Sequence, residues 1–216
     1  MNIDEIRLVT WDVDGTLYSL RRMKWFVLLK YLKETIKGNG AFARENLAAL
    51  RRYRGMIDRA RAEGGLLSDS FRDEVDFSYF EAATHRWYVE AIAKSGPRSG
   101  VKEVLISLRN RGLPLVVFSD YVAESKLKVL GLAEYFDGVY AGERLGFVKP
   151  HPALLERIAA DFSVRIETVL HIGDRVERDE AAARAAGCQC LILGRDFRNF
   201  ESLWQTVSTV TRQRRV

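Results

Sequence analysis

The sequence predicts an α/β protein with a doubly wound parallel sheet and an all-helical cap domain. After Gly96, short apolar segments rich in β-branched residues alternate with segments whose apolar residues recur every three or four positions. An apolar segment of the first kind also opens the chain, whereas residues 20–95 have helical periodicity and no strand pattern. Strands and helices that alternate through short connections imply a parallel sheet covered on both faces.

The predicted core consists of residues 1–19 and 96–216, and the predicted cap of residues 20–95. The first strand ends in Asp-Val-Asp-Gly-Thr, a turn-forming cluster. We expect core strands at 6–11, 113–118, 139–141, 169–172 and 190–193, and core helices at 101–111, 123–130, 152–162 and 179–186.

Three helices are expected in the cap, at 21–37, 41–63 and 70–94, because glycines interrupt the helical pattern between them. The second helix is basic and contains Arg44, Arg51, Arg52, Arg54, Arg59 and Arg61. A solvated face is the ordinary meaning of such a charge run, and a basic wall that faces the substrate is the alternative.

Composition indicates a folded protein with anionic partners. A chain of 216 residues with 47% hydrophobic residues is long enough to bury a core. Its formal net charge of +5 does not choose among phosphorylated metabolites, nucleic acid and a membrane surface. The N-terminus lacks the apolar stretch of a secretory signal, and the longest apolar run, 25–29, is far below the roughly 20 residues that span a bilayer. We therefore expect a cytoplasmic protein that does not enter membranes.

Acidic and hydroxyl side chains follow three of the predicted strands. Asp12 and Asp14 follow the first strand, Ser119 and Asp120 follow the second, and Asp174 follows the strand at 169–172. Because ligand sites of parallel α/β sheets lie at the carboxyl ends of the strands, these residues are expected to meet at one edge.

The spacing of the acids favours a divalent cation. Asp12 and Asp14 repel each other unless a cation lies between them. Asp174, with Asp179 at the start of the next helix, adds the oxygen ligands that Mg²⁺ prefers. Asp12, Asp14, Asp174 and Asp179 are therefore the candidate magnesium ligands, and the ion would polarise a phosphoryl oxygen.

The remaining polar residues suit a phosphate group. Lys149 supplies a fixed positive charge, and Ser119 with nearby backbone N–H groups would hold phosphate oxygens. Gly15, Thr16 and Asp120 are assigned to substrate binding. In this arrangement one carboxylate attacks phosphorus to give an aspartyl-phosphate, while another protonates the departing oxygen and later activates water.

In order, these residues resemble the four motifs of the haloacid dehalogenase-like (HAD) hydrolase superfamily. The motifs are Asp12-Val13-Asp14-Gly15-Thr16, Ser119 after Leu115-Val116-Val117-Phe118, Lys149-Pro150, and Gly173-Asp174-Arg175-Val176-Glu177-Arg178-Asp179. The resemblance covers the first twenty residues and the chain from about Pro97 to Gly194.

The resemblance implies a role for each matching residue. Asp12 is similar to the family's nucleophile and Asp14 to its acid/base, which would contact the metal through its backbone carbonyl. Ser119 and Lys149 are similar to its phosphate contacts, and Asp174 to its metal ligand. The family also implies a mobile helical cap between the first two motifs, and phosphatase chemistry, since its dehalogenase members lack the acid at the position of Asp14.

Two features depart from the family pattern. Asp120 replaces a more usual asparagine or glycine, and Arg175 and Arg178 replace Ser and Asn. An acid beside a phosphate site repels anions unless it is paired or points away.

The leading interpretation is a magnesium-dependent phosphatase that cleaves a small phosphorylated metabolite. A phosphotransferase such as a sugar-phosphate mutase is the enzymatic alternative. The other alternative is a non-catalytic module whose cap or basic C-terminal tail binds a partner such as nucleic acid.

Overall fold

The computed structural model describes residues 3–67 and 85–203. Within these residues, five parallel strands form one sheet in the order β3-β2-β1-β4-β5. The strands are β1 (Leu8–Trp11), β2 (Leu115–Ser119), β3 (Gly138–Ala141), β4 (Val169–Gly173) and β5 (Gln189–Ile192). The chain order reverses on either side of β1, which confirms the predicted doubly wound sheet.

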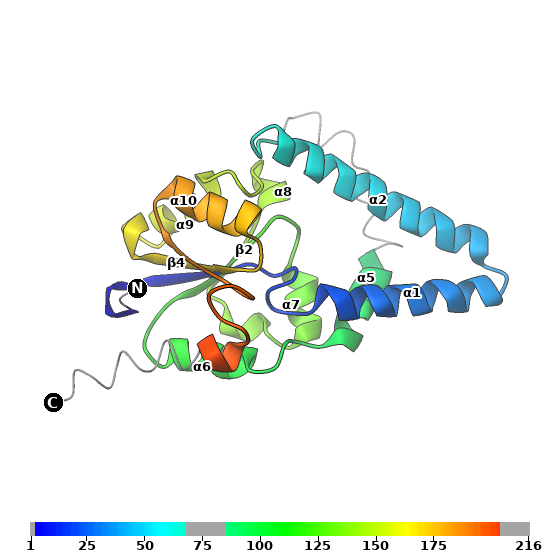
Figure 1. Ribbon diagram of the computed structural model, residues 1–216, viewed down its shortest axis with the longest axis horizontal. Coiled ribbons are helices and arrows are strands. Elements are labelled where there is room, and N and C mark those ends of the chain that lie inside the picture. The colour runs from blue at the N-terminus through cyan, green and yellow to red at the C-terminus, as the bar shows by residue number, and fades with distance from the viewer. Residues whose placement is uncertain (1–2, 68–84, 204–216) are drawn as a thin grey trace.

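Helices cover both faces of the sheet (Figure 1). Side chains alternate along β1, so Val9 and Trp11 belong to one apolar cluster and Leu8 to the other. The first cluster includes side chains of α6 (Val101–Arg109) and α7 (Glu124–Leu130). The second includes side chains of α9 (Ala153–Asp161) and α10 (Ala181–Ala186).

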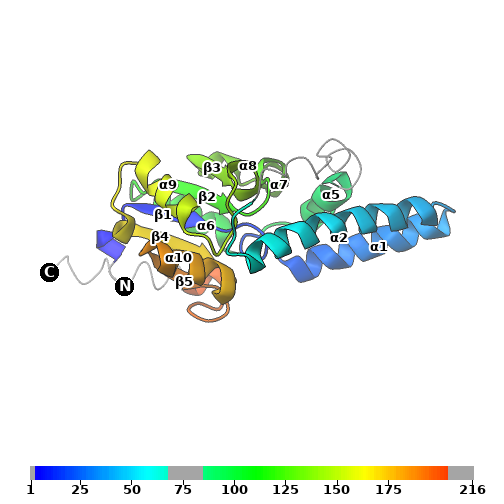
Figure 2. The same ribbon diagram turned by 90° about the horizontal axis from the view of Figure 1, so that it is seen from above.

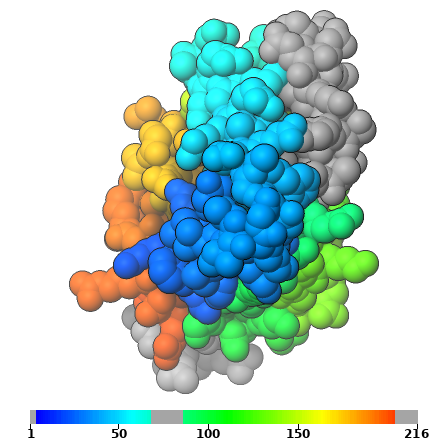
Figure 3. Space-filling view, turned by 90° about the vertical axis from the view of Figure 1, so that its right-hand side faces the viewer, coloured from blue at the N-terminus to red at the C-terminus, as the bar shows by residue number. Residues whose placement is uncertain are grey.

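The described parts of the helical insertion, residues 20–67 and 85–95, project from the core on the side where β1 ends (Figures 1 and 2). Ser19 caps helix α1 (Leu20–Ile36), because its side chain accepts a hydrogen bond from the N–H of Arg22. Helix α2 (Gly40–Ala62) returns beside α1, and α5 (His85–Ser95) packs against α1 and α7. Viewed along the insertion, α1 and α2 lie in front of the core (Figure 3).

Short segments join these elements of the described core. Three are the 3₁₀ turns Ile3–Glu5, Ala133–Tyr135 and Ile166–Thr168, and a fourth is the four-residue helix α8 (Gly142–Leu145), which follows β3. Within the described residues no helix is long and apolar enough to cross a membrane.

Several predicted boundaries change. The strand expected at 6–11 begins at Leu8, and the one expected at 113–118 begins at Leu115, immediately after Pro114, which has no N–H to donate. The helix expected at 179–186 begins at Ala181, because a π-helical turn, Val176–Glu180, precedes it. The third cap helix, expected at 70–94, is observed as α5, and its earlier part lies outside the described residues.

Candidate active site

The expected strand-end residues meet at one edge of the sheet. Asp12 follows β1, Ser119 ends β2, and Asp174 follows β4. The N–H of Asp12 donates to the carbonyl of Ile172 at 2.9 Å, which ties the first acidic loop to β4. The convergence predicted from the strand pattern is therefore present.

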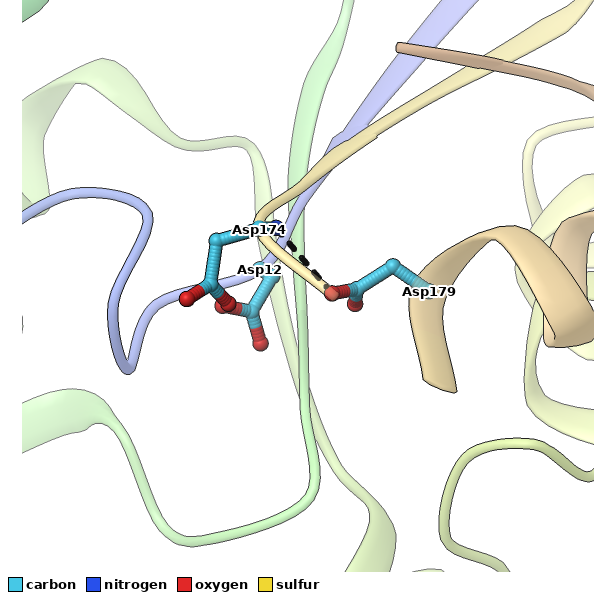
Figure 4. Close-up of side chains that lie close together, drawn as sticks. All are labelled: Asp12, Asp174 and Asp179. Carbon is cyan, nitrogen blue, oxygen red and sulfur yellow. Dashed lines mark hydrogen bonds between the residues drawn. The ribbon is translucent and has the colours of Figure 1, made fainter. Parts of the chain in front are cut away.

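Three carboxylates form a compact cluster at this edge. One oxygen each of Asp12, Asp174 and Asp179 lies within 4.8 Å of the others, and Figure 4 shows the three side chains close together, Asp12 from the loop after β1 and the other two from the segment after β4. Two glycines permit this approach. A Cβ on Gly15, whose φ is +112°, would lie 2.3 Å from Asp174 Oδ2, and one on Gly173 would lie 2.2 Å from Asp179 Cγ.

Lys149 is fully buried against this cluster. Its Nζ donates to Asp12 Oδ1 at 2.6 Å and to Asp179 Oδ1 at 2.7 Å, and it lies over the ring of Phe118. Burial alone would lower the pKa of Lys149, but the charges of Asp12 and Asp179 raise it well above its ordinary value. Lys149 is therefore a fixed cation.

The acids of the cluster carry more negative charge than Lys149 balances. Burial, reinforced by the charges of Asp179 and Asp174, raises the pKa of Asp12 to about 8 despite the opposing effect of Lys149. Burial and Asp179 likewise raise the pKa of Asp174 to about 6. Such an excess of negative charge fits a divalent cation, which favours ionised carboxylates.

Asp179 is the most fully engaged member of the cluster. Its Oδ2 accepts the backbone N–H groups of Asp174 and Arg175, and its Oδ1 contacts Lys149 and His171 Nε2. Burial would raise the pKa of Asp179, but Lys149 and His171 lower it far below its ordinary value. The other ring nitrogen of His171 lies 2.9 Å from Thr10 Oγ1, so this histidine supports Asp179 from inside the sheet.

The carboxylate of Asp14 is not part of the three-carboxylate cluster. Its carboxylate forms an ion pair with Lys126 of α7 and accepts hydrogen bonds from the hydroxyls of Tyr18 and Tyr88. Of the four predicted metal ligands, Asp14 is thus the one whose side chain lies outside the cluster, because Lys126 attracts it. Lys126 was not among the predicted site residues, since a lysine within a helical pattern carries no signal of its own.

The substrate-binding candidates adjoin Asp12 and Lys149. The hydroxyl of Thr16 donates to Asp12 Oδ2 at 2.9 Å, and Ser119 is buried with its Oγ accepting the N–H of Tyr121 at 3.2 Å. Asp120 is paired: its Oδ1 accepts the N–H of Lys149 at 2.8 Å, and its Oδ2 accepts from Arg61 at 2.6 Å. Pairing resolves the expected repulsion between this acid and a bound phosphate.

A cleft of about 740 Å³, open to solvent, lies above these groups. It is lined by Asp12, Asp14, Leu20, Lys24, Arg54, Asp58, Asp120, Tyr121, Lys149, Asp174, Arg175, Arg178 and Asp179. The basic helix α2 therefore has two kinds of arginine: Arg54 lines the cleft, while Arg51 and Arg52 are exposed and do not. Both departures in the fourth motif, Arg175 and Arg178, also face the cleft.

A parallel α/β core with carboxylates and a buried lysine at its strand ends, beside a helical insertion, defines a doubly wound protein whose polar ligand site lies at that edge of the sheet. The model of haloacid dehalogenase-like hydrolases matches residues 6–187, and the chain belongs to this family. The resemblance seen in the four motifs is confirmed, and the protein is an enzyme.

Curated relatives match most of the chain. A phosphoglycolate phosphatase of Aquifex aeolicus (strain VF5) is 28% identical over 191 residues, which cover 87% of this chain and 85% of that protein. The pyrophosphatase PpaX of Halalkalibacterium halodurans is 27% identical, over 88% of this chain and 84% of that protein.

Solved structures show the same fold. The HAD-hydrolase YfnB from Bacillus subtilis, bound to magnesium, has a TM-score of 0.70 at 19% identity and covers 94% of this chain and 98% of that chain. A HAD phosphatase from Thermococcus onnurineus has a TM-score of 0.67 at 20% identity, with the same coverage.

Proposed function

We propose that the protein is a magnesium-dependent phosphatase that hydrolyses a small phosphate monoester through an aspartyl-phosphate on Asp12. One observation carries the proposal: the buried Lys149 contacts Asp12 and Asp179, two of three clustered carboxylates whose charges a single lysine does not balance. The phosphate group of a substrate would pair with the lysine and would supply oxygen ligands to a divalent cation. The cation in turn would balance the charge of the acids.

Asp12 and Asp174 suit Mg²⁺ best among the acids. Both have raised pKa values, whereas the oxygens of Asp179 already accept from Lys149, His171 and two backbone N–H groups. Asp14 would contribute its backbone carbonyl, as the family resemblance implies. The bound ion would neutralise these acids and withdraw charge from a phosphoryl oxygen. Asp179 would then act by holding Lys149 in place.

The chain's own residues account for both halves of the reaction. A carboxylate oxygen of Asp12 attacks phosphorus, and the bond from phosphorus to the ester oxygen breaks as Asp14 gives that oxygen a proton. Asp14 then takes a proton from water, whose oxygen attacks phosphorus and releases Asp12 and inorganic phosphate. Lys149 and the hydroxyl of Ser119 would hold the phosphoryl oxygens meanwhile.

Four cations favour a leaving group that is itself an anion. Lys24 of α1, Arg54 of α2, Arg175 and Arg178 line the cleft in addition to Lys149. Arg54 is half-buried and donates to the hydroxyl of Tyr88 at 2.7 Å, so its side chain is held within the site. The relatives named for phosphoglycolate and for pyrophosphate agree with this class, because both compounds release an anion.

The test is phosphate release, with and without Mg²⁺, from phosphoglycolate, pyrophosphate, glycerol phosphate and an aryl phosphate. We expect turnover that EDTA abolishes and a higher kcat/KM for the two substrates with anionic leaving groups. Transfer of the phosphate to a second hydroxyl, instead of its release into solution, would show that the enzyme is a phosphotransferase. Absence of turnover on all of these compounds would contradict the proposal.

A further inference from the structure

The ion pair between Arg61 and Asp120 joins the helical insertion to the phosphate-binding edge. Asp120 directly follows Ser119, lines the cleft and is only 5% exposed. A buried carboxylate at this place opposes the binding of a phosphate dianion unless its charge is balanced.

Arg61, near the end of α2, supplies that balance. Its Nη2 lies 2.6 Å from Asp120 Oδ2, and the two side chains are 8% and 7% exposed. The charge of Asp120, together with its hydrogen bond, raises the pKa of Arg61 despite the opposing effect of burial, so the guanidinium remains charged. The residue also pairs with Asp58 one turn earlier.

The same carboxylate reaches the backbone of Lys149. Asp120 Oδ1 accepts the N–H of Lys149 at 2.8 Å, so one oxygen faces the helical insertion and the other faces the residue that contacts Asp12. A shift of Asp120 toward or away from Arg61 would therefore be transmitted to Lys149.

The segment that follows α2 is fixed to the core beside this pair. The N–H of Leu67 donates to Gly146 at 2.9 Å and the N–H of Val148 donates to Gly65 at 2.8 Å, forming a bridge just before Lys149. Gly65 is required for this approach, since a Cβ there would lie 2.3 Å from the carbonyl oxygen of Val148. The bridge thus holds the chain just after Arg61 against the chain just before Lys149.

From these contacts we infer that Arg61 is a positioning residue for phosphate binding: it neutralises Asp120 and thereby holds Asp120 and Lys149 in the arrangement that accepts a phosphate. The inference rests on the proposed function and adds a residue from the helical insertion to it. It also explains how this chain tolerates an acid where the family more usually has asparagine or glycine.

The experiment compares Arg61→Met, which keeps an unbranched side chain but removes the charge, with Arg61→Lys, which keeps the charge. Arg59→Met is the matched control, because Arg59 is exposed on the same helix. For each folded variant we would measure kcat, KM, the inhibition constant of inorganic phosphate with Mg²⁺, and the unfolding midpoint. We expect Arg61→Met to weaken phosphate binding about tenfold or more, since one unbalanced charge nearby is worth at least that factor. Arg61→Lys should retain most of the binding, and Arg59→Met should match the wild type.

The decisive variant is Arg61→Met combined with Asp120→Asn. Asparagine keeps an oxygen for the N–H of Lys149 and removes the charge that Arg61 balances. We expect phosphate binding to return to within about threefold of the wild type, because the repulsion is gone. Failure of this rescue, or unchanged phosphate binding in Arg61→Met with only a lower unfolding midpoint, would overturn the inference.

Direct calorimetric titration with inorganic phosphate and Mg²⁺ separates the two proposals. Should the wild type bind phosphate but hydrolyse no ester, the proposed function fails while the role of Arg61 in binding is still measured. Should the combined variant not fold, Arg61→Lys against Arg61→Met gives the result: equal losses in both would reject charge balance as the role of Arg61.

Discussion

Lys126 forms an ion pair with Asp14, and this contact joins helix α7 to the loop that follows β1. Both side chains are largely buried, with the rings of Tyr88 and Tyr121 beside the ammonium group. Burial alone would raise the pKa of Asp14, but the charge of Lys126, with hydrogen bonds from Lys126 and Tyr18, holds it below its ordinary value. Lys126 thus sets the protonation of the proposed acid/base.

We predict that Lys126→Met shifts the pH dependence of turnover to higher pH. Without the neighbouring cation the pKa of Asp14 rises, so its protonated form persists to higher pH and its ionised form is lost sooner on acidification. The measurement is kcat/KM from pH 5 to 9 on an aryl phosphate. Lys128→Met, exposed on the same helix, is the control. If the pH dependence of kcat/KM does not shift and only the rate falls, Lys126 contributes to packing and not to the protonation of Asp14.

Asp12→Asn should abolish turnover without destabilising the metal-free protein. Asparagine keeps the shape of the side chain but cannot form the acyl phosphate. Burial and the neighbouring acids raise the pKa of Asp12, so ionisation of Asp12 lowers the free energy of unfolding of the metal-free protein as pH rises toward 8. Asparagine does not ionise, so the variant lacks this loss of stability. Phosphate release and the unfolding midpoint in EDTA at pH 8 test both halves. Retained turnover would exclude Asp12 as the nucleophile.

Arg54→Ala should reduce catalytic efficiency selectively on esters with an anionic leaving group. A hydrogen bond to a charged group is worth about 1.5 to 3 kcal/mol, or roughly 10- to 150-fold. Arg51→Ala, on the same helix but exposed, should change little. The comparison is kcat/KM on the best anionic substrate relative to an aryl phosphate. Equal ratios in wild type and Arg54→Ala would exclude a specificity role for this residue.

Glu143 should make the fold less stable as pH rises from about 4.5 to 7. It is buried, and although its Oε1 accepts the N–H of Val122 at 2.6 Å, its Oε2 has no hydrogen-bond partner among the described residues. Burial raises its pKa to about 7, against smaller opposing effects of that N–H and of Arg144.

The sign of this effect follows from proton binding. Between its unfolded and folded pKa values Glu143 binds more protons when folded, so the free energy of unfolding falls with pH, by roughly 3 kcal/mol at most. Glu143→Gln should remove this part of the pH dependence, whereas Glu134→Gln, at an exposed position, should not. Urea unfolding at pH 5 and pH 8 measures it. Equal pH dependence in wild type and Glu143→Gln would contradict the assignment.

The sequence by itself determined the core and the placement of its acids. Strands such as 115–119 are short, apolar and β-branched, and a parallel sheet brings their carboxyl ends to one edge whatever the details of packing. Asp12, Ser119 and Asp174 could therefore be assigned to one site before any coordinates. The boundaries were less accurate, as the π-helical turn before α10 illustrates, because element ends depend on local hydrogen bonds rather than on apolar periodicity.

Only the tertiary structure decided how the helical insertion contributes to the site. The arginines of α2 are alike in sequence, but the rotation of the helix against the core directs Arg54 and Arg61 inward and leaves Arg51 exposed. The partners of Asp14 and Asp120 are likewise distant in the chain, at Lys126 and Arg61. A lysine or arginine in a helix has no periodic signal that distinguishes a buried ion pair from a solvated charge. The difference arises from which surfaces pack together, and that depends on contacts between segments far apart in sequence.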